Sequence, residues 1–279
     1  MHPQFKGQVR NRSAWRGPDF DGDESWVYHL TDTDIAELDT ALAMVTEKSL
    51  KPLAFTRKEF PLPTFGVQLD KILEELENGR GFVLMRGLPI DRYDEVAMYR
   101  LYWGMAVYLG DMISQNAKGD LIGRVEDIGV DYHSFNARGY TTSAELHPHN
   151  DSADLVGLLC IRQARTGGES HIASALTIYN EILAAHPDYI DVLYDGFHYD
   201  IRGEGMTSDP NEVTQNRIPL YSYFDDRLSC RFNPRAITTA ADKMKKPLSG
   251  AEHDVVEMMS KLAIDPAIRH EMILQPGDL

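Results

Sequence analysis

A histidine and an aspartate stand two residues apart near the middle of the chain, at His149 and Asp151. On an extended strand, side chains at positions i and i+2 point to the same face, so one imidazole and one carboxylate can converge on a single metal ion. Such a pair is two-thirds of the 2-His-1-carboxylate facial triad, which holds Fe(II) and leaves coordination positions open. The spacing therefore predicts a metal site at His149 and Asp151 that lacks one histidine.

The same spacing occurs twice more in the sequence, so it does not identify the site by itself. His186 and Asp188 lie between two helical patterns, where Pro187 and Asp188 are typical of a helix start. His198 and Asp200 lie in a short strand-like run and compete with the first pair on geometry. The surroundings of each pair must decide between them.

The surroundings favour the first pair. The run His-Asn-Asp-Ser-Ala-Asp (149–154) is followed by Val-Gly-Leu-Leu-Cys (156–160) and by Gly-Gly-Glu-Ser-His-Ile-Ala-Ser (167–174), which indicate a strand, a turn and a further strand. This run resembles the taurine dioxygenase-like family of Fe(II)/2-oxoglutarate-dependent oxygenases. Weaker agreement extends from residues 81–89 to the closing Pro-Gly-Asp at 276–278.

The resemblance implies the chemistry. Members of that family bind Fe(II) and 2-oxoglutarate, consume O₂, and oxidise a small organic substrate, usually by hydroxylation, while succinate and CO₂ are released. It implies that Ser170 contacts the cosubstrate and that Gln115 borders the cosubstrate cavity. Each residue has a second interpretation, because a strand serine or a loop amide also bonds nearby backbone groups. Asp154 and His147 either support the metal ligands or play local roles.

The second histidine is absent from the position that the resemblance gives it. In the family this histidine, and then an arginine that binds the far carboxylate of 2-oxoglutarate, follow a Pro-Gly-Asp turn. Here that turn ends at Asp278, and the given chain ends at Leu279. Three explanations compete: a C-terminal part of the fold lies beyond 279, the chain is a truncation that binds metal poorly, or another histidine such as His198 or His270 substitutes.

Composition limits the partners. The net charge of −15 over 279 residues argues against nucleic-acid binding, which needs a basic surface, and against attraction to anionic membranes. No apolar run is long enough for a membrane span and no signal peptide is evident, so we expect a cytoplasmic protein. Cys160 and Cys230 are read as small hydrophobic residues in a reduced protein rather than as a disulfide. The sequence does not decide whether the protein forms a homo-oligomer.

Local patterns predict the elements of one oxygenase-like domain over 1–279, with an irregular arm at about 1–30 and a loop at 132–140. Helices are predicted at 31–49, 69–76, 91–109, 173–185, 189–194 and 249–262. Strands are predicted at 81–87, 121–125, 155–161 and 197–202 and from 270, with a hairpin at 220–232. These elements indicate a mixed α/β fold with a mainly β core. The family resemblance implies a double-stranded β-helix, the cupin-like jelly roll, with flanking helices.

Two rival functions remain beside the oxygenase. A non-catalytic member of the fold would have lost its C-terminal ligands, and a cupin-type metalloenzyme would work without 2-oxoglutarate. Succinate formed from added 2-oxoglutarate separates the oxygenase from both rivals.

Overall fold

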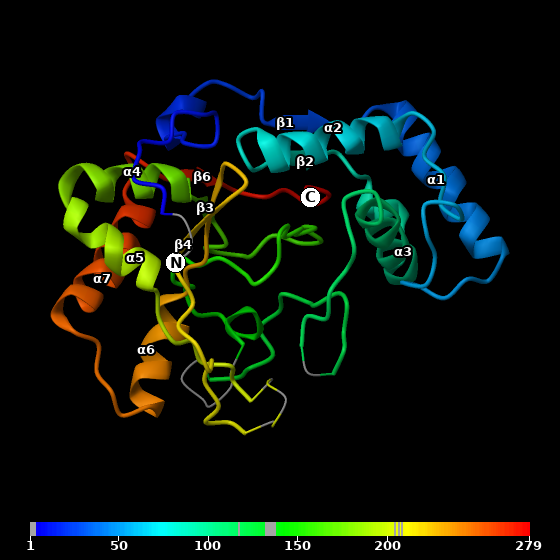
Figure 1. Ribbon diagram of the computed structural model, residues 1–279. Coiled ribbons are helices and arrows are strands. Elements are labelled where there is room, and N and C mark those ends of the chain that lie inside the picture. Colours follow the sequence, from blue (N-terminus) through cyan, green and yellow to red (C-terminus); the bar gives the residue numbers. More distant parts are fainter. Residues whose placement is uncertain (1–3, 117, 132–137, 204, 206, 208) are drawn as a thin grey trace.

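The computed structural model describes residues 4–116, 118–131, 138–203, 205, 207 and 209–279. Residues 132–137 of the predicted loop lie outside this set. The described helices form two groups, one on each side of a central region of irregular chain (Figure 1). The first group contains α1 (Asp32–Glu47), α2 (Phe65–Asn78) and α3 (Glu95–Ala106). The second contains α4 (Ala175–Ala185), α5 (Ile190–Asp195), α6 (Pro234–Lys243) and α7 (Gly250–Ile264).

The predicted helix starts are confirmed at α1 and α7, because each has a complete capping box. At α1 the Thr31 side chain accepts from the Asp34 N–H, and the Asp34 carboxylate accepts from the Thr31 N–H at 2.8 Å. Ser249 and Glu252 repeat the arrangement at α7. Such boxes satisfy backbone donors that no helical carbonyl can reach. Helix α6 was not predicted, although Asn233 as N-cap and Pro234 as first residue are a start signal.

Each helical group buries its own hydrophobic cluster. The first is formed by α1, α2 and α3 with the strand that follows α2, and its fully buried side chains include Leu38, Phe65 and Leu101. The second is formed by α4 to α7 and a hairpin, and includes Tyr179 and Tyr221, which are both 0% exposed. The main apolar clusters are therefore built largely from helix faces.

Strands in the described residues are short and pair two by two. Strand β1 (Val27–His29) runs parallel to β2 (Leu84–Arg86), and β3 (Ser170–Ile172) runs antiparallel to β6 (His270–Met272). The predicted hairpin is confirmed as β4 (Tyr221–Phe224) and β5 (Arg227–Cys230). The fold is a mixture of α and β, as predicted.

The prediction of a mainly β core is wrong for the described residues. The runs 121–125 and 155–161 are not strands, and 197–202 makes only isolated bridges. Val125, Val156 and Leu158 are 70%, 60% and 51% exposed. An apolar run becomes a strand only where another strand pairs with its backbone groups, and these runs lack such a partner over most of their length.

The closing turn lies between β2 and the apolar run after the His149–Asp151 pair. Leu279 and Met85 exchange two backbone hydrogen bonds of 2.8 Å. On the other side, the Cys160 N–H donates to Asp278 O at 2.8 Å and the Gly277 N–H donates to Cys160 O at 2.9 Å. These contacts join three segments that are distant in sequence, and the chain end lies in the centre of the molecule (Figure 1).

The N-terminal arm is irregular up to β1, apart from a 3-10 turn at Gly17–Phe20. Trp15 anchors it: the side chain is 8% exposed and its indole N–H donates to the Arg80 carbonyl at 2.8 Å. Both cysteines are free, as predicted. None of the helices in the described ranges is long and apolar enough to cross a membrane.

Candidate functional site

The side chains of His149 and Asp151 lie close together, although the strand from which their closeness was predicted is absent. His149 Nε2 is 3.8 Å from Asp151 Oδ1, and the two side chains are 31% and 59% exposed. The segment is not a strand, so the proximity does not come from regular pleating. Both groups remain open to solvent and can be approached by an ion.

A hydrogen bond selects the tautomer of His149. Its Nδ1 lies 2.7 Å from the carbonyl oxygen of His147. A carbonyl accepts but cannot donate, so Nδ1 carries the proton and Nε2 keeps its lone pair on the side of Asp151. Metal-ligating histidines commonly use one ring nitrogen in this way to orient the other. The pair fits a divalent cation, and His147 contributes its backbone rather than its exposed imidazole.

The competing pairs serve the fold. Asp200 is 8% exposed and accepts from Lys243 Nζ at 2.6 Å, while His198 Nδ1 lies 2.8 Å from the Thr214 carbonyl. The Asp200 carboxylate thus forms a buried ion pair with Lys243. His186 precedes a 3-10 turn at Pro187–Tyr189 and stacks on Tyr189 with ring centroids 4.8 Å apart.

A third ligand is not found near the pair. Within the described part of the chain, no three His, Cys, Asp or Glu side chains are grouped closely enough to hold a metal ion. His270 lies in β6 among Phe20, Trp26 and Phe82, with its ring centroid 4.9 Å from that of Trp26. Its Nε2 is buried and has no hydrogen-bond partner. Burial lowers the pKa of this imidazole from its ordinary 6.5, against the raising effect of Asp21.

The two residues predicted to contact the cosubstrate are differently placed. Ser170 begins β3 opposite Met272, directly after a turn in which Gly167 and Gly168 have φ of 72° and 83°. Gln115 is exposed, and its amide donates to the Ile113 carbonyl at 3.0 Å, which is the local role considered from the sequence. His171 projects to the face opposite Ser170 and pairs with Glu271 at 3.0 Å.

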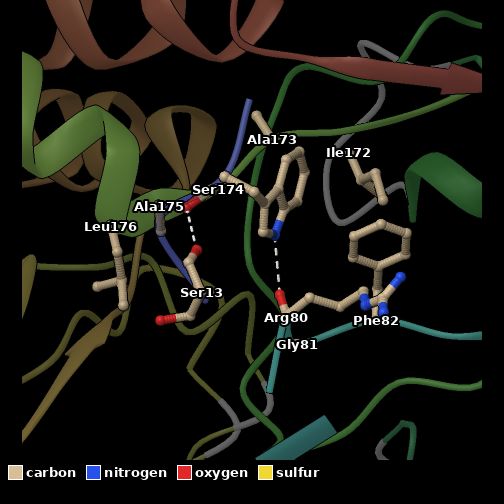
Figure 2. A pocket seen from close by; sticks show the side chains of 10 residues that line it. Ser13, Arg80, Gly81, Phe82, Ile172, Ala173, Ser174, Ala175 and Leu176 are labelled. Carbon is tan, nitrogen blue, oxygen red and sulfur yellow. Dashed lines mark hydrogen bonds between the residues drawn. The ribbon is translucent and has the colours of Figure 1, made fainter. Parts of the chain in front are cut away.

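A cavity lies elsewhere in the molecule. It measures about 280 Å³ and is lined by the N-terminal arm, residues Arg80–Phe82 and the start of α4. Figure 2 shows Ile172 and Phe82 on one side of it and Leu176 on the other. The Ser174 hydroxyl donates to the Ser13 carbonyl at 2.5 Å, which ties the arm to α4. None of His149, Asp151, Ser170 and Gln115 lines this cavity.

Comparisons with known sequences find a family and related proteins. A family model described as "Taurine catabolism dioxygenase TauD, TfdA family" matches residues 47–279. "FR-33289 synthase" of Streptomyces rubellomurinus is 30% identical over 277 residues, which are 99% of this chain and 81% of the relative. "Taurine hydroxylase-like protein SAT17" of Stachybotrys chartarum is 25% identical over 287 residues, at 99% and 72% coverage.

Solved structures give the same fold. An asparagine oxygenase in complex with Fe(II), 2S,3S-3-hydroxyasparagine and succinate matches with a TM-score of 0.65 and 15% identity, over 91% of this chain and 83% of that one. The non-heme iron oxygenase OrfP, in complex with Fe and alpha-ketoglutaric acid, matches with a TM-score of 0.51 and 14% identity, over 90% and 83%. At such identities the likeness concerns the fold.

Proposed function

Because the chain belongs to the TauD/TfdA family of dioxygenases, whose cofactors are Fe(II) and 2-oxoglutarate, we propose that His149 and Asp151 are its iron ligands. The observation that carries this is the orientation of His149. Its protonated Nδ1 is bound to the His147 carbonyl, which leaves Nε2 free beside the Asp151 carboxylate. One neutral imidazole and one carboxylate are the donors that non-haem Fe(II) takes in a facial triad.

The residues of the pair act by binding and orienting. When bound, Fe(II) with 2-oxoglutarate and O₂ supplies the oxidation of the substrate, with succinate and CO₂ as the other products. Asp151 contributes negative charge that attracts the cation, and the exposure of both side chains leaves room for further ligands. The hydrogen bond to the His147 carbonyl orients the His149 ring and leaves Nε2 as the ligating nitrogen.

We propose two contacts to 2-oxoglutarate. Ser170 stands after the double-glycine turn with its hydroxyl free of any hydrogen bond to the other described residues, so it can donate to a carboxylate. Gln115 serves only if its amide leaves the Ile113 carbonyl, so its contribution is the smaller one.

The substrate is proposed to be a small organic molecule that is hydroxylated, since relatives carry the names hydroxylase and oxygenase. The likeness to asparagine oxygenase supports the double-stranded β-helix as the architecture. A cytoplasmic location and a homo-oligomer remain predictions from the sequence.

Succinate formation tests the function. The protein from its own source is incubated with Fe(II), ascorbate and 2-oxoglutarate, and succinate is measured beside Asp151→Ala and a matched Asp188→Ala variant. We expect succinate from the wild type and from Asp188→Ala, and a loss of at least about 100-fold in Asp151→Ala. Metal binding without succinate would favour a cupin-type enzyme, and neither would favour a non-catalytic member of the fold.

A further inference from the structure

Asn150, the residue between the two proposed iron ligands, is bound to the backbone of Phe232. The Asn150 N–H donates to Phe232 O at 2.7 Å, and the Phe232 N–H donates to Asn150 Oδ1 at 3.1 Å. The side chain therefore closes a two-bond clamp with a residue 82 positions away. The side-chain oxygen of Asn150 is thus used by the Phe232 N–H.

This clamp attaches the site segment, and directly after the segment the Tyr102 hydroxyl donates to Gly157 O at 2.8 Å. Among the described residues, the two bonds to Phe232 are the hydrogen bonds that join residues 145–156 to another part of the chain. The bond between His149 and the His147 carbonyl is internal to the segment. A segment without regular structure and with few external bonds is free to move, so the clamp limits where the two ligands lie.

Phe232 itself is firmly held. Its side chain is 4% exposed in the cluster formed by α4 to α7. The preceding residue, Arg231, donates through its N–H to Leu220 O and accepts from the Tyr199 hydroxyl at 2.7 Å. The following residue, Asn233, is the N-cap of α6. Phe232 thus connects the exposed site segment to a buried core.

We propose that Asn150 is the positioning residue of the metal pair, which it holds in place through the backbone of Phe232. The proposal rests on the proposed function for the identity of the ligands. Asn150 touches neither metal nor substrate in this account. It acts by keeping His149 and Asp151 at a separation that one cation can bridge, and such supporting contacts commonly change metal affinity by about 10-fold to about 100-fold.

The chain offers a matched control in Asn180. Its Oδ1 accepts from the Val9 N–H at 2.8 Å and its Nδ2 donates to Val9 O at 2.8 Å, which is a two-bond clamp far from the site in sequence. Asn150→Ala removes one side-chain hydrogen bond and Asn180→Ala removes two, so the control is the more severe change. Two readouts are measured for each: hydrogen exchange at the amides of Phe232 and residues 149–151, and the Kd for Mn(II) by electron paramagnetic resonance.

We expect Asn150→Ala to speed exchange at the Phe232 amide about fivefold or more, since one hydrogen bond is lost, and to weaken Mn(II) binding about tenfold. Asn180→Ala should change neither. Asn150→Asp, which keeps an oxygen acceptor, should restore slow exchange at Phe232. Unchanged Mn(II) affinity in Asn150→Ala, beside a loss of binding in His149→Ala, would overturn the proposal.

Failure of the proposed function is recognised separately. If His149→Ala binds Mn(II) as the wild type does, the pair is not the metal site. The clamp is then tested by hydrogen exchange at the Phe232 amide alone. If this amide exchanges equally slowly in Asn150→Ala and in the wild type, the proposed clamp is wrong.

Discussion

Arg86 and Asp278 are joined by two parallel hydrogen bonds, from Arg86 Nε to Asp278 Oδ1 at 2.9 Å and from Nη2 to Oδ2 at 2.7 Å. The Asp278 side chain is 1% exposed and that of Arg86 is 27% exposed. The pair links β2 to the closing Pro-Gly-Asp turn, which in turn contacts the apolar run after the metal pair. The hydrogen bonds to Asp278 raise the pKa of Arg86, so the guanidinium is charged at every pH of interest.

The two partners should not be equally sensitive to replacement. Arg86→Ala leaves a buried carboxylate whose one remaining donor among the described residues is the Gln275 N–H, whereas Asp278→Ala leaves a guanidinium that water can reach. We expect Arg86→Ala to lower the free energy of unfolding by about 3 kcal/mol and Asp278→Ala by less. Lys6→Ala, which breaks an exposed ion pair, should cost under about 1 kcal/mol. Urea unfolding of the three variants measures this, and equal losses for Arg86→Ala and Lys6→Ala would refute it.

Gly277 should tolerate no side chain. Its φ is +91°, and a Cβ there would lie 2.1 Å from the Leu88 carbonyl oxygen. Gly119 has a similar φ of +84° but open space around it. Gly119→Ala therefore measures the backbone strain alone, of order 1 kcal/mol, and Gly277→Ala adds the steric clash. We expect a clearly larger drop in Tm for Gly277→Ala, and similar drops in both variants would contradict the close approach of the turn to Leu88.

Features that depend on residues close in sequence were predicted correctly, whereas contacts between distant residues were not predicted. The capping boxes at Thr31 and Ser249 fixed two helix starts because each depends on residues three apart. His149 and Asp151 lie close together because they are two residues apart, although the predicted strand is absent. The clamp between Asn150 and Phe232 joins residues 82 apart, so the local sequence pattern does not predict it.

The predicted strands at 121–125 and 155–161 are wrong, because an apolar run forms a strand only where another strand pairs with it. The run 155–161 has the apolar composition of a buried strand, yet Val156 and Leu158 are exposed because only Cys160 exchanges backbone bonds with the closing turn. Helix α6 could have been predicted from Asn233 and Pro234. The prediction for Gln115 could not be decided from sequence, because a loop amide serves a ligand and a local carbonyl equally well.

His270 should make stability depend on pH. Because burial lowers its folded-state pKa below 6.5, the unfolded chain binds a proton on this histidine before the folded chain does. Its contribution is therefore present above about pH 6.5 and is lost as the pH falls toward the folded-state pKa. Urea unfolding at about pH 7.5 and about pH 5.5 measures this effect. We expect the free energy of unfolding to fall less in His270→Phe than in the wild type as the pH is lowered. Parallel pH curves for the two proteins would exclude this role.

Ser170 and Gln115 should differ in their effect on 2-oxoglutarate. Ser170→Ala removes a free hydroxyl that can donate to a carboxylate, so we expect the Kd for 2-oxoglutarate to rise about tenfold, with metal affinity unchanged. Gln115→Ala should raise it about threefold or less, since the amide already serves the Ile113 carbonyl. Isothermal titration under anaerobic conditions measures both. An unchanged Kd in Ser170→Ala would remove Ser170 from the site.

Metal titration of three proteins tests whether His149 and Asp151 bind the iron. Anaerobic binding of Fe(II), or of Mn(II) in its place, is measured for the wild type, for His149→Ala and for His198→Ala, which alters the competing pair whose aspartate is bound to Lys243. We expect His198→Ala to retain the wild-type affinity and His149→Ala to lose at least about 100-fold. Retained affinity in His149→Ala, or its loss in His198→Ala alone, would show that the metal binds elsewhere.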